Sequence, residues 1–195
     1  LRAGGSPRTP NLDALAAHGT RFDFAHAHAP LTRPSHASIF TGSYPFEHGV
    51  RDHSGYRMKP GAVTLATLLK EKGFATGAFV GGVPLAREFG LDAGFDVYDD
   101  RFGRVNASSD FSLAERPAEA VVDAALKWIE GRDGRWFAWV HVFDPHTPYA
   151  PPAPFYAEYA ARPYDGEVAY VDKALGPLLD RAGQGPRPTT VLVTS

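Results

Sequence analysis

The segment WFAWVHVF, residues 136–143, decides the fold class because it is apolar almost throughout. Such a run is typical of a strand that is buried on both faces, as strands of parallel sheets are. Two further segments have the same character: ATGAFVGG at residues 75–82 and TVLVTS at residues 190–195. The sequence therefore predicts three buried strands.

Helical segments alternate with these strands. Thr9 and Pro10 predict a helix start with Thr9 as the N-cap, and Gly19 ends that helix. Residues 21–29 suggest a short strand or an extended approach to a loop, and residues 83–115 lack periodicity, as a long surface excursion does. Further helices are predicted at residues 35–40, 64–72, 117–130 and 166–179. The alternation predicts an α/β fold with a doubly wound, mostly parallel sheet and helices on both faces.

Composition limits the function. The 195 residues are 44% hydrophobic and 22% charged, which suits one globular domain, and the net charge of −2 favours neither nucleic acid nor an anionic membrane as a partner. The absence of cysteine excludes disulfides, a cysteine nucleophile and thiolate metal ligands. We expect no membrane segment within this chain, because no run reaches the ~18 apolar residues of a span. The opening at Leu1 is typical of a mid-protein loop and is compatible with a targeting segment upstream, so the compartment stays open.

The stretch APLTRPSHASIFTGSYPFEHGV, residues 29–50, carries the first candidate site. Ligands of doubly wound sheets bind at the carboxyl ends of strands, and this stretch follows a predicted strand. Thr32 offers a hydroxyl just before a short helix, whose N-terminus favours an anionic ester, and His36 lies one turn further on. The alternative is that Ser35 caps the helix and that the histidines are incidental, and the residues alone leave both interpretations open.

The second candidate site is DPHTPYAPP, which follows residues 136–143. His146 stands between two prolines, where a rigid loop would direct the imidazole toward an ester oxygen or a leaving group. Asp144 would orient that ring or cap the turn. The alternative is a proline-rich turn with an exposed histidine.

Other polar residues fit simpler roles. His26 and His28 would share one face of a strand without a third metal ligand, so we expect a structural or surface role. Arg101 and Arg104 are candidate anion ligands, although exposed arginines are common. Asp172 lies on an otherwise apolar helix and is expected to make a cap or a salt bridge.

Six segments spread along nearly the whole chain carry a resemblance to a known family: TPNLDALAAHGTRF, APLTRPSHASIFTGSYPFEHGVR, LATLLKEKGFATGAFV, FDPHTPYAPPAPF, YDGEVAYVDKALGPLLD and TVLVTS. In this order they resemble the sulfatase family of the alkaline phosphatase superfamily. The family signature is Cys or Ser, any residue, Pro, Ser and Arg, with Thr-Gly a few residues on, and TRPSHASIFTG aligns with it without a gap. The resemblance implies an alkaline phosphatase-like fold, with residues 1–195 as a single partial catalytic domain.

The resemblance also implies roles for three residues. Thr32 falls on the nucleophile position and would also bind the metal, His36 falls on the arginine position, and His146 falls on the histidine that contacts the sulfuryl group. Thr32 and His146 would then be catalytic, while His36 and His146 would bind substrate. The implied cofactor is a divalent metal ion, calcium, or manganese or zinc for a phosphate substrate. The implied substrate is a small-molecule, glycan or lipid ester.

The chain departs from the family pattern at specific places. Thr32 replaces the Cys or Ser that is converted to formylglycine, and residues 79–82 replace an expected lysine-and-histidine motif. The family's metal-binding aspartates would lie just before and just after this chain, so we expect the 195-residue piece to be inactive and to bind metal poorly.

Three hypotheses follow from these features. The leading one is a metal-dependent hydrolase of sulfate esters with Thr32 as the nucleophile. The second is a phosphodiesterase or phosphoglycerol transferase of the same superfamily, because those enzymes use a metal-bound threonine at this position. The third is a non-catalytic binding domain that kept the fold. A zinc protease is disfavoured because the chain has no His-Glu-x-x-His motif.

Overall fold

The computed structural model describes residues 6–102, 115–185 and 187–195. Its elements, in chain order, are α1 (Pro10–His18), α2 (Thr32–Thr41), α3 (Pro45–His48), α4 (Leu65–Glu71), β1 (Ala75–Val80), η1 (Val83–Leu85), η2 (Arg87–Phe89), β2 (Val97–Asp99), α5 (Ala118–Glu130), β3 (Trp136–His141), α6 (Phe155–Glu158) and α7 (Pro163–Gly183). The helices predicted at residues 64–72, 117–130 and 166–179 are confirmed as α4, α5 and α7.

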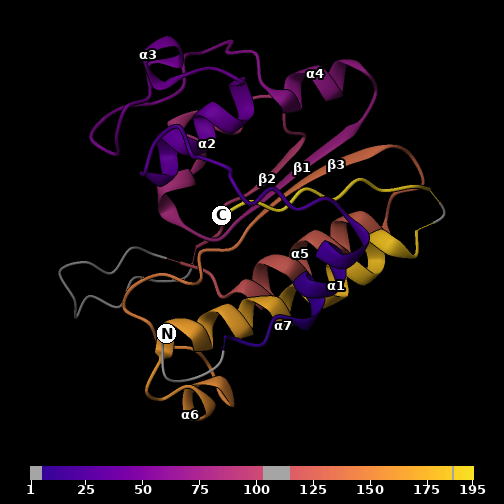
Figure 1. The fold of residues 1–195 in the computed structure, drawn as a ribbon. Coiled ribbons are helices and arrows are strands. Elements are labelled where there is room, and N and C mark those ends of the chain that lie inside the picture. The colour runs from indigo at the N-terminus through magenta and orange to yellow at the C-terminus, as the bar shows by residue number, and fades with distance from the viewer. Residues whose placement is uncertain (1–5, 103–114, 186) are drawn as a thin grey trace.

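The three strands form one parallel sheet in the order β2-β1-β3 (Figure 1). Successive side chains of a strand point to opposite faces, and β1 follows this rule. Val80 packs with Phe40 of α2 on one face, whereas Phe79 packs with Val121 of α5 on the other. Both faces of β1 are therefore buried, as the apolar run predicted.

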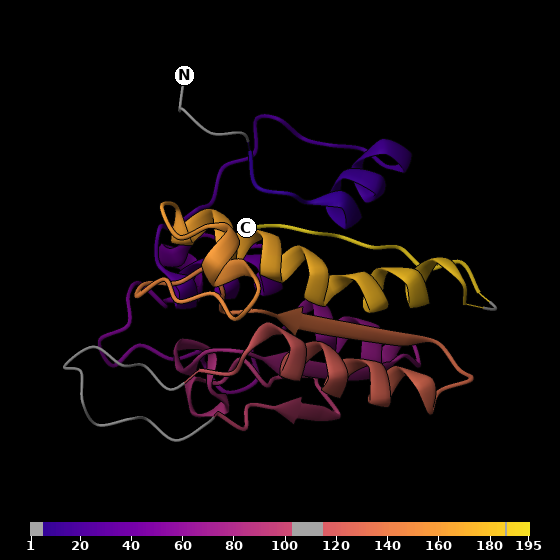
Figure 2. The same ribbon diagram turned by 90° about the horizontal axis from the view of Figure 1, so that it is seen from below.

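Helices cover both faces of this sheet. In Figure 1, α2, α3 and α4 lie on one side, and α5, α7 and α1 lie on the other. α5 packs directly on β1 and β3, α7 packs on α5, and α1 packs on α7 (Figures 1 and 2). The predicted doubly wound α/β arrangement is confirmed.

The start of α1 is capped from a distant part of the chain. Thr9 occupies the N-cap position but makes no side-chain cap bond, so its predicted capping role is wrong. Instead, the buried Asp172 of α7 accepts hydrogen bonds from the N–H groups of Asn11 at 3.2 Å and Leu12 at 2.8 Å. The prediction that Asp172 makes a cap is confirmed.

The strand predictions are only partly correct. Residues 190–195 pair with no strand of the described chain, and Leu192 is 84% exposed. An apolar β-branched run becomes a strand only when a neighbour accepts and donates its backbone hydrogen bonds. Residues 21–29 form bends and extended chain rather than a strand. β3 is half-buried rather than fully buried, because within the described residues it pairs only with β1.

The predicted excursion at residues 83–115 contains regular structure. η1, η2 and the three-residue strand β2 all fall within it, while residues 103–114 lie outside the described part. β2 was not predicted because only three of its residues pair with β1, next to a stretch rich in Asp and Gly that shows no strand periodicity. Among the residues that the structure describes, no helix is long and apolar enough to cross a membrane.

Candidate active site

Thr32 is the first residue of α2, and the next residue, Arg33, contacts Pro84 in η1, shortly after the carboxyl end of β1. The helix begins at Thr32 rather than at residue 35, with Leu31 at the N-cap position. Ser35 lies inside the first turn, where its N–H donates to the Leu31 carbonyl at 3.0 Å, so the capping alternative is wrong. Within the described chain the Thr32 hydroxyl has no hydrogen-bond partner, and it is therefore available to a ligand.

The residue after Thr32 fixes this turn of α2. Arg33 is only 3% exposed, and its guanidinium donates to the Pro84 carbonyl at 3.0 Å and to the His53 carbonyl at 2.9 Å. The guanidinium carbon also lies 3.2 Å from the centroid of the Phe89 ring, a cation–π contact. Desolvation by burial lowers the pKa of Arg33. These contacts tie the start of α2 to η1 and η2, which follow β1, and to the loop around His53, which precedes it.

His36 is turned back onto the backbone of Thr32. Its Nδ1 lies 2.8 Å from the Thr32 carbonyl oxygen, which can only accept, so Nδ1 carries the hydrogen and Nε2 keeps its lone pair in the neutral ring. Burial lowers the pKa of His36. The ring is therefore neutral near pH 7 and lacks the charge of the arginine that the family pattern has here.

A second histidine, which the sequence did not single out, lies against His36. His141 ends β3, and its ring packs edge-on against His36 with centroids 5.0 Å apart. Its Nδ1 is enclosed and has no hydrogen-bond partner in the described chain. Burial, together with the nearby His36, lowers the pKa of His141 to about 3. The carboxyl end of β3 therefore holds a neutral pair of imidazoles beside α2.

His146 lies exposed in the loop beyond β3. Its Nδ1 donates to the Thr147 carbonyl at 2.8 Å, and its ring stacks on Phe143 with centroids 4.1 Å apart. The other ring nitrogen, Nε2, is left without a partner among the described residues. Asp144 was expected to orient the His146 ring or to cap the turn, but its Oδ2 instead accepts from the Ala118 N–H at the start of α5 at 3.2 Å.

Carboxylates surround the base of this loop. Desolvation raises the pKa values of Glu115, Asp144 and Glu167, and the charge of Asp144 raises those of Glu115 and Glu167 further. Glu167 also accepts a hydrogen bond from the His146 backbone N–H at 3.0 Å. The sequence did not reveal Glu167, because nothing in its spacing relates it to a residue 21 positions earlier.

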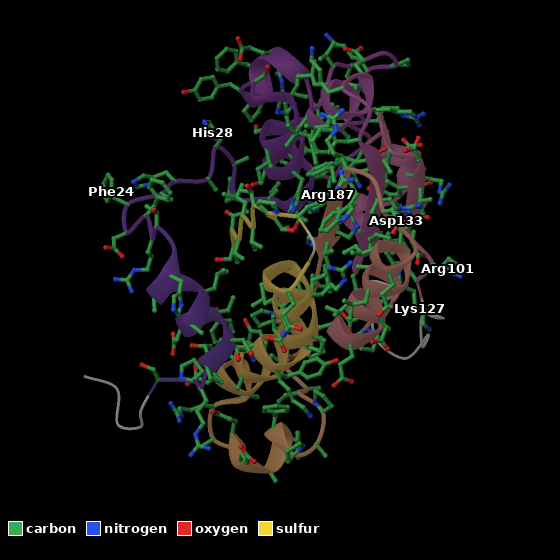
Figure 3. All side chains as sticks on the ribbon, turned by 90° about the vertical axis from the view of Figure 1, so that its right-hand side faces the viewer. Phe24, His28, Arg101, Lys127, Asp133 and Arg187 are labelled. Atoms are coloured by element: carbon green, nitrogen blue, oxygen red, sulfur yellow. The ribbon has the colours of Figure 1, made fainter. Side chains whose placement is uncertain are left out.

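The remaining candidates fit peripheral roles. His26 contacts Phe24, whereas His28 contacts Tyr44, so the two histidines do not form a pair. Figure 3 shows Phe24 and His28 on the outer loop that precedes α2. Arg101 pairs with Asp99 at 2.7 Å, and Arg104 lies outside the described residues.

In the described structure, some of the predicted site residues contact one another and others do not. Thr32 and His36 touch each other, while in that part of the chain neither makes a hydrogen bond or a ring contact with His146. No group of three or more His, Asp or Glu side chains within residues 6–102, 115–185 and 187–195 is arranged to hold a metal ion. The residues present therefore do not fit a metal centre by themselves.

Comparisons with known proteins give a consistent family. A family model described as Sulfatase matches residues 1–195. Arylsulfatase D of Homo sapiens is 34% identical over 139 residues, which cover 62% of this chain and 22% of that protein. Steryl-sulfatase of Rattus norvegicus is 39% identical over 80 residues, which cover 36% of this chain and 14% of that protein.

Solved structures show the same fold at low identity. The crystal structure of Ps i-CgsB in complex with k-i-k-neocarrahexaose superposes with a TM-score of 0.72 at 20% identity, covering 93% of this chain and 51% of that one. Phosphonate monoester hydrolase of Agrobacterium radiobacter superposes with a TM-score of 0.72 at 18% identity, covering 93% and 55%. The chain thus spans about half the length of these structures and less of the curated relatives.

Proposed function

Because the chain belongs to the sulfatase family, we propose that the whole protein hydrolyses sulfate esters and that this chain supplies its nucleophile, Thr32. The observation that carries the proposal is the position of Thr32. Its hydroxyl is unpaired in the described structure, and Thr32 is the first residue of a ten-residue helix whose His36 packs against His141 at the carboxyl end of β3. A helix N-terminus presents free N–H groups and partial positive charge to an anionic ester.

The proposed reaction begins with an in-line attack. Thr32 Oγ1 forms a bond to sulfur, with release of its proton to water, as the bond between sulfur and the alcohol oxygen breaks. His146 donates a proton from Nε2 to the departing alcohol, which requires the imidazolium form because Nδ1 already donates to Thr147. Water then cleaves the threonine sulfate ester and releases sulfate.

The contacts of His36 support a role in fixing the backbone of Thr32 more than a role in binding the anionic ester. A neutral ring whose Nδ1–H is used by Thr32 has no donor left for a sulfuryl oxygen. Its contact with the Thr32 carbonyl instead fixes the backbone of the nucleophile.

The divalent metal ion is proposed for the whole protein. It would be calcium for a sulfate ester, and it would stabilise charge that develops on the ester oxygens. The described residues do not form a metal centre by themselves.

A second candidate, phosphate ester cleavage, is favoured by one observation. An unmodified threonine cannot become formylglycine, and a threonine hydroxyl can attack phosphorus in the same in-line geometry. Glycan, lipid and small-molecule esters remain proposed substrate classes; the neocarrahexaose bound to Ps i-CgsB is a ligand of that protein.

An activity panel on the full-length protein tests both candidates. We would compare an aryl sulfate, a phosphate monoester, a phosphodiester and a phosphonate, using wild type, Thr32→Ala, His146→Ala and, as a matched hydroxyl control, Ser35→Ala. We expect Thr32→Ala to abolish turnover and Ser35→Ala to retain it. Full activity of Thr32→Ala would refute the nucleophile assignment, and inactivity of the wild type toward every ester would favour a binding domain.

A further inference from the structure

Glu167 holds both ends of the segment that carries His146. It lies near the start of α7 and is only 3% exposed. One carboxylate oxygen, Oε2, accepts from the His146 N–H at 3.0 Å, and the other, Oε1, accepts from the Ala150 N–H at 2.7 Å. A single buried side chain therefore binds the first and last residues of HTPYA.

The composition of this segment explains why such a carboxylate matters. Pro145, Pro148 and Pro151 have no N–H groups, so the loop cannot be held by a regular backbone ladder. The few donors that remain need acceptors when they are enclosed, and an ionised carboxylate is a stronger acceptor than a carbonyl. Glu167 takes two of these donors at once.

The orientation of the His146 side chain depends on the position of this backbone and on the contacts of its ring. Its ring lies on Phe143, and Phe143 in turn fills the space beside Gly82, where an added Cβ would meet the ring at 2.3 Å. With Nδ1 engaged by Thr147, the position of Nε2 follows from the backbone position of His146. A shift of that backbone would move Nε2 away from any ester beside it.

We propose that Glu167 is a positioning residue of this site, which acts by anchoring the His146 backbone from α7. The consequence for catalysis rests on the proposed function, whereas the anchoring itself does not. Glu167 touches no reacting atom in this proposal. It sets where the Nε2 of His146 stands when the ester arrives.

Amide hydrogen exchange tests the anchor without any need for activity. Glu167→Gln keeps the size of the side chain but replaces one acceptor oxygen by a donor that faces an N–H. We expect the His146 and Ala150 amides to exchange at least about 10-fold faster in this variant, while the Ala118 amide is unchanged. Asp144→Asn is the matched control, since its carboxylate accepts from Ala118 instead. Unchanged exchange at both His146 and Ala150 would overturn the proposal.

Kinetics of the full-length protein test the consequence. We expect Glu167→Gln to lower kcat by about 10- to 100-fold with a small change in KM, because misplacement of a catalytic group by about 1 Å costs a factor of that order. In the His146→Ala background the same substitution should cause little further loss. An equal loss in both backgrounds would overturn positioning through His146. If His146→Ala alone has full activity, the proposed role of His146 fails, and the exchange result still decides whether Glu167 anchors the loop.

Discussion

Acidification should destabilise this chain through His141. The pKa of its ring is about 3 in the folded state, because Nδ1 is enclosed without a partner and the His36 ring is adjacent. An unfolded histidine titrates at about 6.5, so the unfolded state takes up the proton first as the pH falls. The stability that the neutral His141 contributes is therefore fully present above about pH 6.5, and it is lost progressively as the pH falls to about 3. At pH 5 the expected loss is about 2 kcal/mol, from about 1.5 pH units at 1.36 kcal/mol each.

The assay is urea unfolding at about pH 7.5 and about pH 5, on wild type and on His141→Phe. Phenylalanine keeps an aromatic ring beside Trp139 and His36 but cannot be protonated. Carboxylates elsewhere titrate equally in both proteins, so the difference between the two pH dependences isolates His141. We expect wild type to lose about 2 kcal/mol more than the variant. Equal losses in the two proteins would show that His141 is protonated in the folded state and would refute the burial argument.

Three further predictions concern packing and metal binding. Asp172→Ala should lower the free energy of urea unfolding by about 2 kcal/mol, because two N–H groups at the start of α1 lose their acceptor, and an unchanged midpoint would contradict this. Gly82→Ala should cost about 1–3 kcal/mol in the same assay because its Cβ would lie 2.3 Å from the Phe143 ring, whereas Gly131→Ala, whose Cβ meets nothing within 4 Å, should be nearly neutral; equal effects would contradict the crowding argument. Calorimetric titration of the 195-residue chain with calcium, manganese or zinc should give no tight stoichiometric binding, and such binding would contradict the lack of a three-ligand group in the described residues.

The fold was predictable where local pattern and tertiary environment agree. The apolar run of β1 and the 3.6-residue periodicity of α5 each reflect burial that the structure provides. Residues 190–195 have an equally apolar pattern but form no strand, because a pattern cannot supply the neighbouring strand that completes its hydrogen bonds. β2 shows the converse, since three residues pair with β1 in a segment that has little pattern of its own.

The candidate site divides in the same way. Thr32 and His36 follow from one short motif, and the structure brings them into contact because they lie one helical turn apart. Glu167 and Arg33 escape sequence analysis because their partners, His146 and Pro84, are 21 and 51 positions away. Such roles are created by tertiary packing, so spacing along the chain does not reveal them.

The charge around Thr32 also differs from what the motif alignment implies. The family pattern has an arginine where this chain has His36, and burial keeps that imidazole neutral. The cation of this turn is Arg33, the second residue of α2, where the helix dipole disfavours positive charge and the first turn has no acidic residue. Backbone carbonyls hold its guanidinium, and no carboxylate of the described chain forms an ion pair with it. The charges of Glu88 and Asp52 act on this guanidinium and partly balance it. An anionic ester at Thr32 would therefore meet the positive end of the α2 backbone, while the neutral ring at position 36 adds no charge.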